Sequence, residues 1–286
     1  MDTGTGDDVL SAQELERAAT FSPLSNVPED PSNAVYEDPA AAVLGQFLFF
    51  EPGLSGGGTF SCSTCHDPAK GYGDSIPLSE AEGTTGRHAP TLLGVAHNDW
   101  YFWDGRADSL WAQALAPIEH ASEMNGSRLA LAHLVFDDTD LAQAYSAIFG
   151  ELPDLNDDGR FPAEGKPMSD DPGHVLAQAW AGMEEADRVE INWIYSNLGK
   201  AIAAYERLLV PGEALFDVWV ASLDEEPGGT TLFGEAERRG LKPLARIVAH
   251  ATQSQDPSEF PLAPIGAMTN LFNKTGWSAA DVDLFE

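Results

Sequence analysis

The chain has 286 residues, and with 43% of them hydrophobic it can bury the core of one large domain or two modest ones. Its 15 Lys and Arg against 46 Asp and Glu give a formal net charge of -31. This charge disfavours nucleic acids and anionic membrane surfaces as partners, and it favours either partners with basic rims or simply a solvated surface. We expect no membrane span, because no apolar run comes near the roughly 18 residues that one requires.

The first part of the chain predicts an arm followed by a helix. Residues 1–35 are acidic and rich in Pro and Ser, which is typical of an extended arm, with one short helix at residues 10–15. Residues 39–50 predict a helix that leads into the Gly-rich loop of residues 54–59.

Cys62-Ser63-Thr64-Cys65-His66 follows this loop, and C-x-x-C-H is the attachment motif of a c-type haem. Each thiol can add to one vinyl group of the porphyrin, and the adjacent imidazole can bind the iron. A zinc site would need about two further Cys or His ligands, and the chain has no other cysteine. A thioredoxin-like redox pair would lie near a βαβ pattern rather than a Gly-rich loop. The sequence therefore predicts one covalent haem c, bound by Cys62, Cys65 and His66.

The next segments alternate between loop and helix. Residues 67–99 are rich in Gly and Pro and predict a long loop, whereas apolar spacing predicts helices over residues 107–116 and 127–136. Another short helix is expected from Asp140 to Phe149, and a polar insertion at residues 150–173.

Within the insertion, Asp154 to Gly159 matches the start of a calcium-binding loop. The twelfth position is Gly165 rather than a bidentate Glu, and Phe161-Pro162 interrupts the helix that should follow. We therefore favour an acidic surface turn over a calcium site in this segment.

Helices are expected to dominate residues 174–223. The strongest runs from Arg188 to Leu209, where apolar side chains recur at helical spacing and predict a core stripe rather than cofactor ligands. Little of the chain before residue 240 is typical of a strand, so the predicted fold class is mainly α.

From about Leu44 to Leu223 the chain resembles the bacterial di-haem cytochrome c peroxidase/MauG family. The matching segments are Leu44–Phe50, Ser61–Pro68, Ala89–Leu93, Phe102–Ala107 and Pro117–Met124. They correspond to the N-terminal, peroxidatic haem domain of that family. The resemblance implies a c-type cytochrome haem domain with long loops over residues 36–240.

The resemblance also implies roles for four residues. His66 is the iron ligand, Glu123 the distal acid/base, Gln113 the distal amide, and Trp103 the aromatic side chain between the two haems of the family. A carboxylate can move a proton between the two oxygens of peroxide while an amide orients it. Without the resemblance, Glu123 reads as a surface acid, Gln113 as an ordinary helix residue and Trp103 as a packing residue.

Two departures from the family concern metal ligands. The family often carries a distal His in the loop after the first haem, and residues 78–86 contain none. We therefore expect an open or water-occupied sixth iron position, with His88, His97 and His120 as weaker alternatives. His88 also stands where the family commonly has an Asn of its inter-domain calcium site, so calcium is doubtful there too.

The C-terminal part departs further. Residues 234–241 resemble the family helix that leads to a second C-x-x-C-H, but no second pentad follows. Residues 241–286 resemble an internal fragment of thiolase that lacks the catalytic Cys and His motifs, so we expect no thiolase activity. The junction near Gly240 indicates a fusion of unrelated sequences. We expect a tail that is not an independent domain and exposes Ile, Val and Phe side chains.

The preferred interpretation is a haem-dependent peroxidase that reduces hydrogen peroxide with electrons from a small cytochrome c or cupredoxin, impaired where the second haem domain is lost. A mono-haem electron-transfer protein without peroxide chemistry, a MauG-like haem oxidase and a fusion without function stay open as alternatives. Covalent haem attachment in bacteria takes place outside the cytoplasmic membrane, which predicts a periplasmic protein. The start of the chain shows neither the basic nor the apolar region of a signal peptide.

Overall fold

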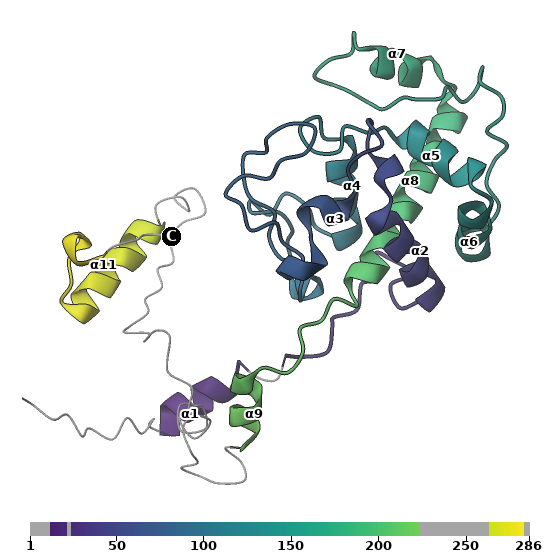
Figure 1. Cartoon of the computed structure of the whole chain (residues 1–286). Coiled ribbons are helices and arrows are strands. Elements are labelled where there is room, and N and C mark those ends of the chain that lie inside the picture. The colour runs from purple at the N-terminus through teal and green to yellow at the C-terminus, as the bar shows by residue number, and fades with distance from the viewer. Residues whose placement is uncertain (1–11, 22–23, 223–262, 283–286) are drawn as a thin grey trace, which may run out of the picture. The chain divides into compact units, whose positions relative to one another are not determined.

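The computed structural model describes residues 12–21, 24–222 and 263–282 (Figure 1). These residues form helices and turns, and they contain isolated β-bridges but no β-strand. Contacts divide the chain into a unit of residues 24–212 and a second unit of residues 1–23 and 213–286. The α-helices of the described residues are α1 (Ala12–Ala19), α2 (Pro39–Phe50), α3 (Cys62–Cys65), α4 (Leu110–Glu119), α5 (Arg128–Asp137), α6 (Thr139–Phe149), α7 (Val175–Gly182), α8 (Glu185–Glu206), α9 (Leu215–Ser222) and α11 (Ala263–Thr275). The 3-10 helices are η1 (Pro52–Leu54), η2 (Pro68–Lys70), η3 (Val95–His97) and η5 (Ala279–Asp281).

The mainly α fold that the sequence predicts is confirmed. The helix expected over residues 39–50 is α2 with the same bounds, because Asp38 caps it and accepts a hydrogen bond from the backbone N–H of Ala40 at 2.8 Å. The helix expected at residues 10–15 corresponds to α1, which continues to Ala19. Part of the expected arm is packed rather than extended, since Asn33 is buried and its side-chain amide donates to the Lys200 carbonyl at 3.0 Å.

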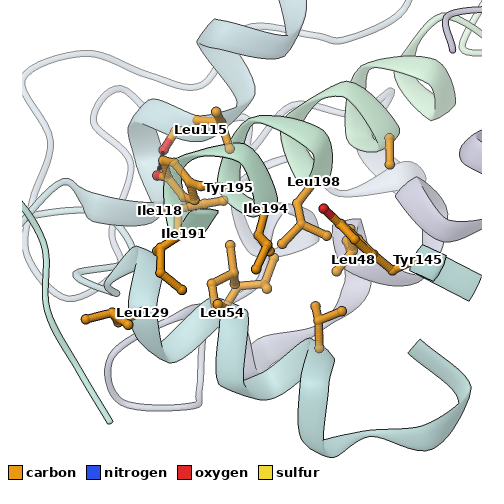
Figure 2. Close-up of a cluster of buried hydrophobic side chains, with 14 of the residues drawn as sticks. Leu48, Leu54, Leu115, Ile118, Leu129, Tyr145, Ile191, Ile194, Tyr195 and Leu198 are labelled. Atoms are coloured by element: carbon orange, nitrogen blue, oxygen red, sulfur yellow. Dashed lines mark hydrogen bonds between the residues drawn. The ribbon is translucent and has the colours of Figure 1, made fainter. Parts of the chain in front are cut away.

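Helix α8 is the axis of the larger unit, and α2, α4 and α5 pack against it (Figure 1). Its core stripe includes Ile191, Ile194, Tyr195 and Leu198, which meet apolar side chains of the other three helices (Figure 2). Each fully buried Leu or Ile side chain contributes about 1.5–3 kcal/mol by leaving water, so this stripe is a main source of stability.

Two glycines let the neighbouring backbones approach α8 closely. A Cβ atom on Gly45 of α2 would lie 1.9 Å from the carbonyl oxygen of Ala201 in α8. A Cβ atom on Gly199 of α8 would lie 2.7 Å from the Trp111 carbonyl oxygen and 2.7 Å from Cγ of Leu115, both in α4. Any larger residue at either position would push the helices apart, so the two glycines set the spacing of α2 and α4 from α8.

Two long irregular segments complete the larger unit. Between α3 and α4 the chain forms only η2, η3 and turns, in agreement with the loop expected over residues 67–99. The insertion at residues 150–173 holds no helix. It is more than a polar surface turn, however, because Leu155 and Phe161 are fully buried in the core.

The calcium-like turn inside the insertion uses its oxygens locally. The Asp154 carboxylate accepts hydrogen bonds from the backbone N–H of Asn156 at 3.1 Å and from its side-chain amide at 2.7 Å. Asp157 likewise accepts from the Gly159 N–H at 3.0 Å. Among the described residues, no group of three or more His, Cys, Asp or Glu side chains is arranged to hold a metal ion.

The thiolase-like tail is described only in α11 and the short segment after it. Ile265 and Trp277 there are exposed. Phe272 and Val282 are half-buried. The expected junction near Gly240 and the Ile, Val and Phe side chains of residues 242–262 and 283–286 lie outside the described residues. Across the described ranges, the helices are too short or too polar to cross a membrane.

The glycine contact predicts a large stability effect. Gly45→Ala should lower the free energy of unfolding by about 2–3 kcal/mol, because the added methyl group overlaps the Ala201 backbone and the helices must separate. Urea denaturation followed by far-UV circular dichroism measures the change. Gly182→Ala is the matched control, since a Cβ atom on Gly182 meets no atom within 4 Å. Equal midpoints for the two variants would disprove the close-packing argument.

Candidate functional site

The C-x-x-C-H pentad forms the single turn of α3 and the residue after it. The Ser61 N–H donates to Oγ1 of Thr64 at 3.1 Å, and the His66 N–H donates to the Cys62 carbonyl at 2.9 Å. Residues three apart are neighbours on a helix surface, so this turn places Cys62 and Cys65 on the same side.

Both cysteines are free thiols that favour the protonated state. Burial raises the pKa of the Cys62 thiol to about 12, with a smaller contribution from the Glu206 carboxylate. Burial also raises the pKa of Cys65, helped by Asp74 and Glu123. Thiol–disulfide exchange requires a thiolate, so the raised pKa values disfavour it. Both thiols remain available for thioether bonds.

The imidazole of His66 is held in one orientation by the backbone. Its Nδ1–H donates to the Tyr72 carbonyl at 3.0 Å, which Gly71 and Tyr72 bring into place by adopting positive φ angles of 68° and 59°. Burial lowers the pKa of His66. The ring is thus neutral near pH 7, and the hydrogen bond at Nδ1 assigns metal binding to Nε2.

A cavity of about 600 Å³ joins the pentad to the other predicted residues. Its wall includes Cys65, His66, Trp103, Gln113 and Glu123. These residues come from α3, α4 and the two loops that flank α4. The structure therefore brings together in one cavity all of the predicted site residues except Cys62. That residue lines an adjoining chamber of about 50 Å³, together with Cys65, His66, Gln113 and Glu123.

Glu123 lies on the turn after α4, and Gln113 lies within α4. The Glu123 carboxylate oxygen Oε1 is 3.2 Å from Nδ1 of His120, and the carboxyl side chain is 29% exposed. The Glu123 carbonyl accepts a hydrogen bond from the Glu82 N–H at 3.1 Å. The acid is thus reachable from the cavity while its backbone is tied to the opposite loop.

Trp103 lies at the rim of the cavity and not in the core. Its side chain is 56% exposed, its Nε1–H donates to the His88 carbonyl at 3.3 Å, and its ring centroid is 5.1 Å from that of His88. Neighbouring Asp104 accepts hydrogen bonds from Arg87 and Arg106, which lower its pKa to about 2. Core packing, the alternative drawn from sequence alone, does not account for the place of Trp103.

The wall of the cavity depends on Asp74, which sequence reasoning missed. This side chain is buried and accepts hydrogen bonds from the Ser79 hydroxyl and from the N–H groups of Ile76 and Ala89, at 3.2 and 3.4 Å for the latter two. Burial alone would raise its pKa, but these hydrogen bonds bring the pKa below the ordinary value. An ionised carboxylate therefore holds the loop in place. Its only sequence signal is an acid within a Gly- and Pro-rich loop.

Glu206, the last residue of α8, was also missed. It is 5% exposed, lines the smaller chamber beside Cys62, and its Oε2 atom has no hydrogen-bond partner. Burial raises its pKa to about 8. A signal was present in the sequence, because Glu206 continues the i, i+4 series of Leu198 and Ile202 along the core stripe.

These observations fit a c-type haem. The cavity volume lies within the range of about 300–1,000 Å³ that is usual for small-molecule and cofactor sites. The protonated thiols of Cys62 and Cys65 and the neutral, oriented imidazole of His66 line the cavity or the chamber that adjoins it. Cys62 and Cys65 would bind the porphyrin, and His66 would bind the iron.

Comparisons with known proteins give two family matches. The model for "Di-haem cytochrome c peroxidase" matches residues 39–225, and the model for "Thiolase, C-terminal domain" matches residues 241–286. The first covers more than half of the chain, whereas the second covers only the tail.

Individual relatives agree with the first match. "Methylamine utilization protein MauG" of Methylorubrum extorquens is 31% identical over 242 residues, which are 84% of this chain and 55% of that protein. "Cytochrome c551 peroxidase" of Pseudomonas aeruginosa is 31% identical over 70% of this chain and 46% of its own length. The chain thus spans about half the length of the curated relatives it matches. A crystal structure of a MauG-like protein associated with microbial copper homeostasis shares the fold, with a TM-score of 0.50 and 21% identity over 77% of this chain and 53% of that one.

The buried acid predicts a pH-dependent stability. The pKa of Glu206 rises from 4.5 to about 8 on folding, so between these values the folded chain keeps a proton that the unfolded chain has lost. The free energy of unfolding therefore falls as pH rises through this window, by up to about 1.4 kcal/mol per pH unit. Glu206→Gln should remove this loss, so that the free energy of unfolding of the variant rises relative to that of the wild type from pH 5 to pH 8.

Urea denaturation of the haem-loaded protein across this pH range measures the difference. Glu190→Gln is the control, because Glu190 is an exposed acid of the same helix. If the difference in free energy of unfolding from the wild type were the same for both variants and did not change with pH, Glu206 would not be the buried titrating group.

Proposed function

The chain belongs to the di-haem cytochrome c peroxidase family, and on this basis we propose that it is the peroxidatic haem domain of a peroxidase. The proposed reaction converts hydrogen peroxide, two electrons and two protons into two molecules of water. The observation that supports it best is that Glu123 and Gln113 line the same cavity as Cys65 and His66.

Three residues bind the cofactor in this proposal. Cys62 and Cys65 form the thioether bonds, and Nε2 of His66 binds the iron while the Tyr72 carbonyl fixes the ring through Nδ1. When bound, the haem supplies the redox-active iron for peroxide reduction. The 286 residues contain a single C-x-x-C-H, so we propose one haem for this stretch of chain.

Glu123 and Gln113 act on the peroxide. The Glu123 carboxylate takes the proton from one peroxide oxygen and returns it to the other, so that the O–O bond breaks and the departing oxygen leaves as water. The remaining oxygen becomes the second water when two electrons and two protons are supplied. The Gln113 amide donates a hydrogen bond that orients the peroxide. His120, 3.2 Å from Glu123 Oε1, holds the carboxylate toward the cavity.

Electrons reach the site through the rim in this proposal. Trp103 is exposed at the cavity edge, where its ring can relay electrons from a small cytochrome c or cupredoxin. A protein made of these residues alone lacks the second haem of the family, so we propose slow turnover with protein donors. We also propose a periplasmic location and a haem domain over residues 36–240. The tail over residues 241–286 is proposed not to be an independent domain.

A MauG-like haem oxidase is the second candidate. It is favoured by the relative named MauG, which aligns with 84% of this chain, and by the exposure of Trp103. Such an oxidase removes electrons from another protein instead of receiving them. Assays with a reduced cytochrome and with an oxidisable protein tryptophan separate the two functions.

The proposed acid predicts a kinetic defect. In the haem-loaded protein, Glu123→Gln should slow the reaction with hydrogen peroxide by about 10²–10⁴-fold, because the proton transfer is lost while the shape of the side chain is kept. Stopped-flow absorbance measures this rate. Glu80→Gln removes the same charge from an exposed position and should react like the wild type. A wild-type rate for Glu123→Gln would remove Glu123 from the mechanism.

The sixth iron position separates a peroxidase from a simple electron carrier. The haem-loaded ferric protein as isolated should contain high-spin haem, because we expect no side chain besides His66 to bind the iron: residues 78–86 contain no His. Electron paramagnetic resonance and absorbance spectra report the spin state. A spectrum that is purely low-spin would instead favour a mono-haem electron-transfer protein, with His88 and His120, which line the cavity, as the first ligands to test.

A further inference from the structure

The residue proposed as the acid sits on a loop rather than on a helix. Residues 120–127 join α4 to α5. The loop of residues 120–126 folds back on α4 through hydrogen bonds from the Met124 N–H to the Pro117 carbonyl at 3.1 Å and from the Gly126 N–H to the Ile118 carbonyl at 2.7 Å. Sites on loops are held less accurately than sites on helices unless other residues support them. The position of Glu123 therefore depends on what fixes the two ends of this loop.

Lys166 fixes both ends. Its side chain comes from the insertion at residues 150–173 and the residue is only 4% exposed. Its Nζ atom donates one hydrogen bond to the Glu119 carbonyl at 2.7 Å and another to the Gly126 carbonyl at 2.8 Å. These two carbonyls lie on either side of Glu123 in the chain, so one ammonium group closes the loop at its base.

The backbone beside Lys166 is docked on the same region. The Gly165 N–H donates to the Ser127 hydroxyl at 3.2 Å, and the Gly165 carbonyl accepts from the Leu129 N–H at 3.3 Å. A Cβ atom on Gly165 would lie 2.7 Å from Cδ1 of Leu129, so a larger residue would require the Leu129 side chain to move. The insertion thus contacts the start of α5, and these contacts place Lys166 next to the two ends of the loop.

The surroundings of the ammonium group reduce the cost of burying it. Burial lowers the pKa of Lys166, the Glu119 carboxylate opposes this shift, and Arg128 adds to it, so the pKa stays below the ordinary value. Glu119 also binds Arg128, with its two oxygens 2.6 and 3.0 Å from the guanidinium nitrogens. An apolar side chain at position 166 would leave the carbonyls of Glu119 and Gly126 without this donor, which is costly for buried groups.

We infer that Lys166 is a positioning residue for Glu123, and that the insertion at residues 150–173 serves to brace the loop carrying the acid. This inference rests on the proposed function of Glu123. Without the ammonium group the loop keeps its backbone hydrogen bonds to α4 but loses the side-chain donor that joins the Glu119 and Gly126 carbonyls. The carboxylate then spends less time where peroxide is cleaved. The rate of the peroxide reaction then falls by more than the loss of stability explains, since small displacements of a catalytic group have large effects on rate.

The test compares three variants of the haem-loaded protein. Lys166→Met removes the donor, and Lys166→Arg keeps a charged donor of similar length. Arg160→Met is the matched control, because Arg160 also ties the insertion to the rest of the unit, through Asp187 at 2.6 Å, but does not contact the loop. Each variant is measured for haem content, for peroxide reaction rate and for hydrogen exchange of the amides of residues 120–126.

We expect Lys166→Met to retain its haem, to react with peroxide roughly ten- to hundredfold more slowly, and to exchange the loop amides faster. Lys166→Arg should recover part of the rate, and Arg160→Met should keep both the rate and the loop protection. A wild-type rate in Lys166→Met, in a protein where Glu123→Gln is slow, would overturn the inference. So would an equal rate loss in Arg160→Met, which would show a general effect of loosening the insertion.

The exchange measurement separates this inference from the proposed function. If Glu123→Gln itself reacts at the wild-type rate, the proposed function of Glu123 fails. Faster exchange confined to residues 120–126 in Lys166→Met would still support Lys166 as the brace of the loop. Unchanged exchange would overturn that role whatever Glu123 does.

Discussion

The closeness of α2 and α4 to α8 is the constraint on which the rest of the larger unit depends. Gly45 brings the α2 backbone against Ala201, and Gly199 brings α8 against the α4 backbone. Helix α3 packs on α2, and α4 carries Gln113 and leads directly into the Glu123 loop. Protein interiors are close-packed and deform little. The distance from the pentad to Gln113 and Glu123 is therefore set by the contacts of α2 and α4 with α8, and not by contacts among the residues that line the cavity.

The irregular segments around the cavity need a different kind of support. Long loops carry many backbone N–H and C=O groups that must find partners when buried. Here a few buried polar side chains provide them: Asp74 gathers the loop after the pentad, and Lys166 closes the loop after α4. The helices thus give the domain its stability, whereas these anchors give the cavity its shape.

The parts of the structure that depend on local sequence could be predicted. Helical periodicity located α2, α5 and α8 to within a few residues, and the pentad alone identified Cys62, Cys65 and His66 as a group. The same information does not distinguish Glu123 from a surface acid, because its place at the cavity depends on how the turn after α4 meets the loop at Glu82. Only the family resemblance pointed to it.

The buried polar groups were missed for a related reason. Lys166 contacts residues 40 and 47 positions away in the chain, and no local pattern reports such pairing. The insertion was expected to be a solvated turn because its composition is polar, but Leu155 and Phe161 fill the core and Lys166 is enclosed. Trp103 shows the limit of reasoning from residue type alone, since the packing role that its type favours does not predict a side chain that is 56% exposed.

The protonated state of the two cysteines also protects them from oxidation. A C-x-x-C pair closes into a disulfide when one thiolate attacks an external disulfide and the second thiolate then displaces the outside thiol from the mixed disulfide, so the rate depends on the fraction of thiolate present. A pKa of about 12 for Cys62 and a raised pKa for Cys65 favour the thiols over the thiolates in the folded chain. In an oxidising compartment the pair would then stay reduced for longer, which lengthens the time in which a porphyrin can still be captured.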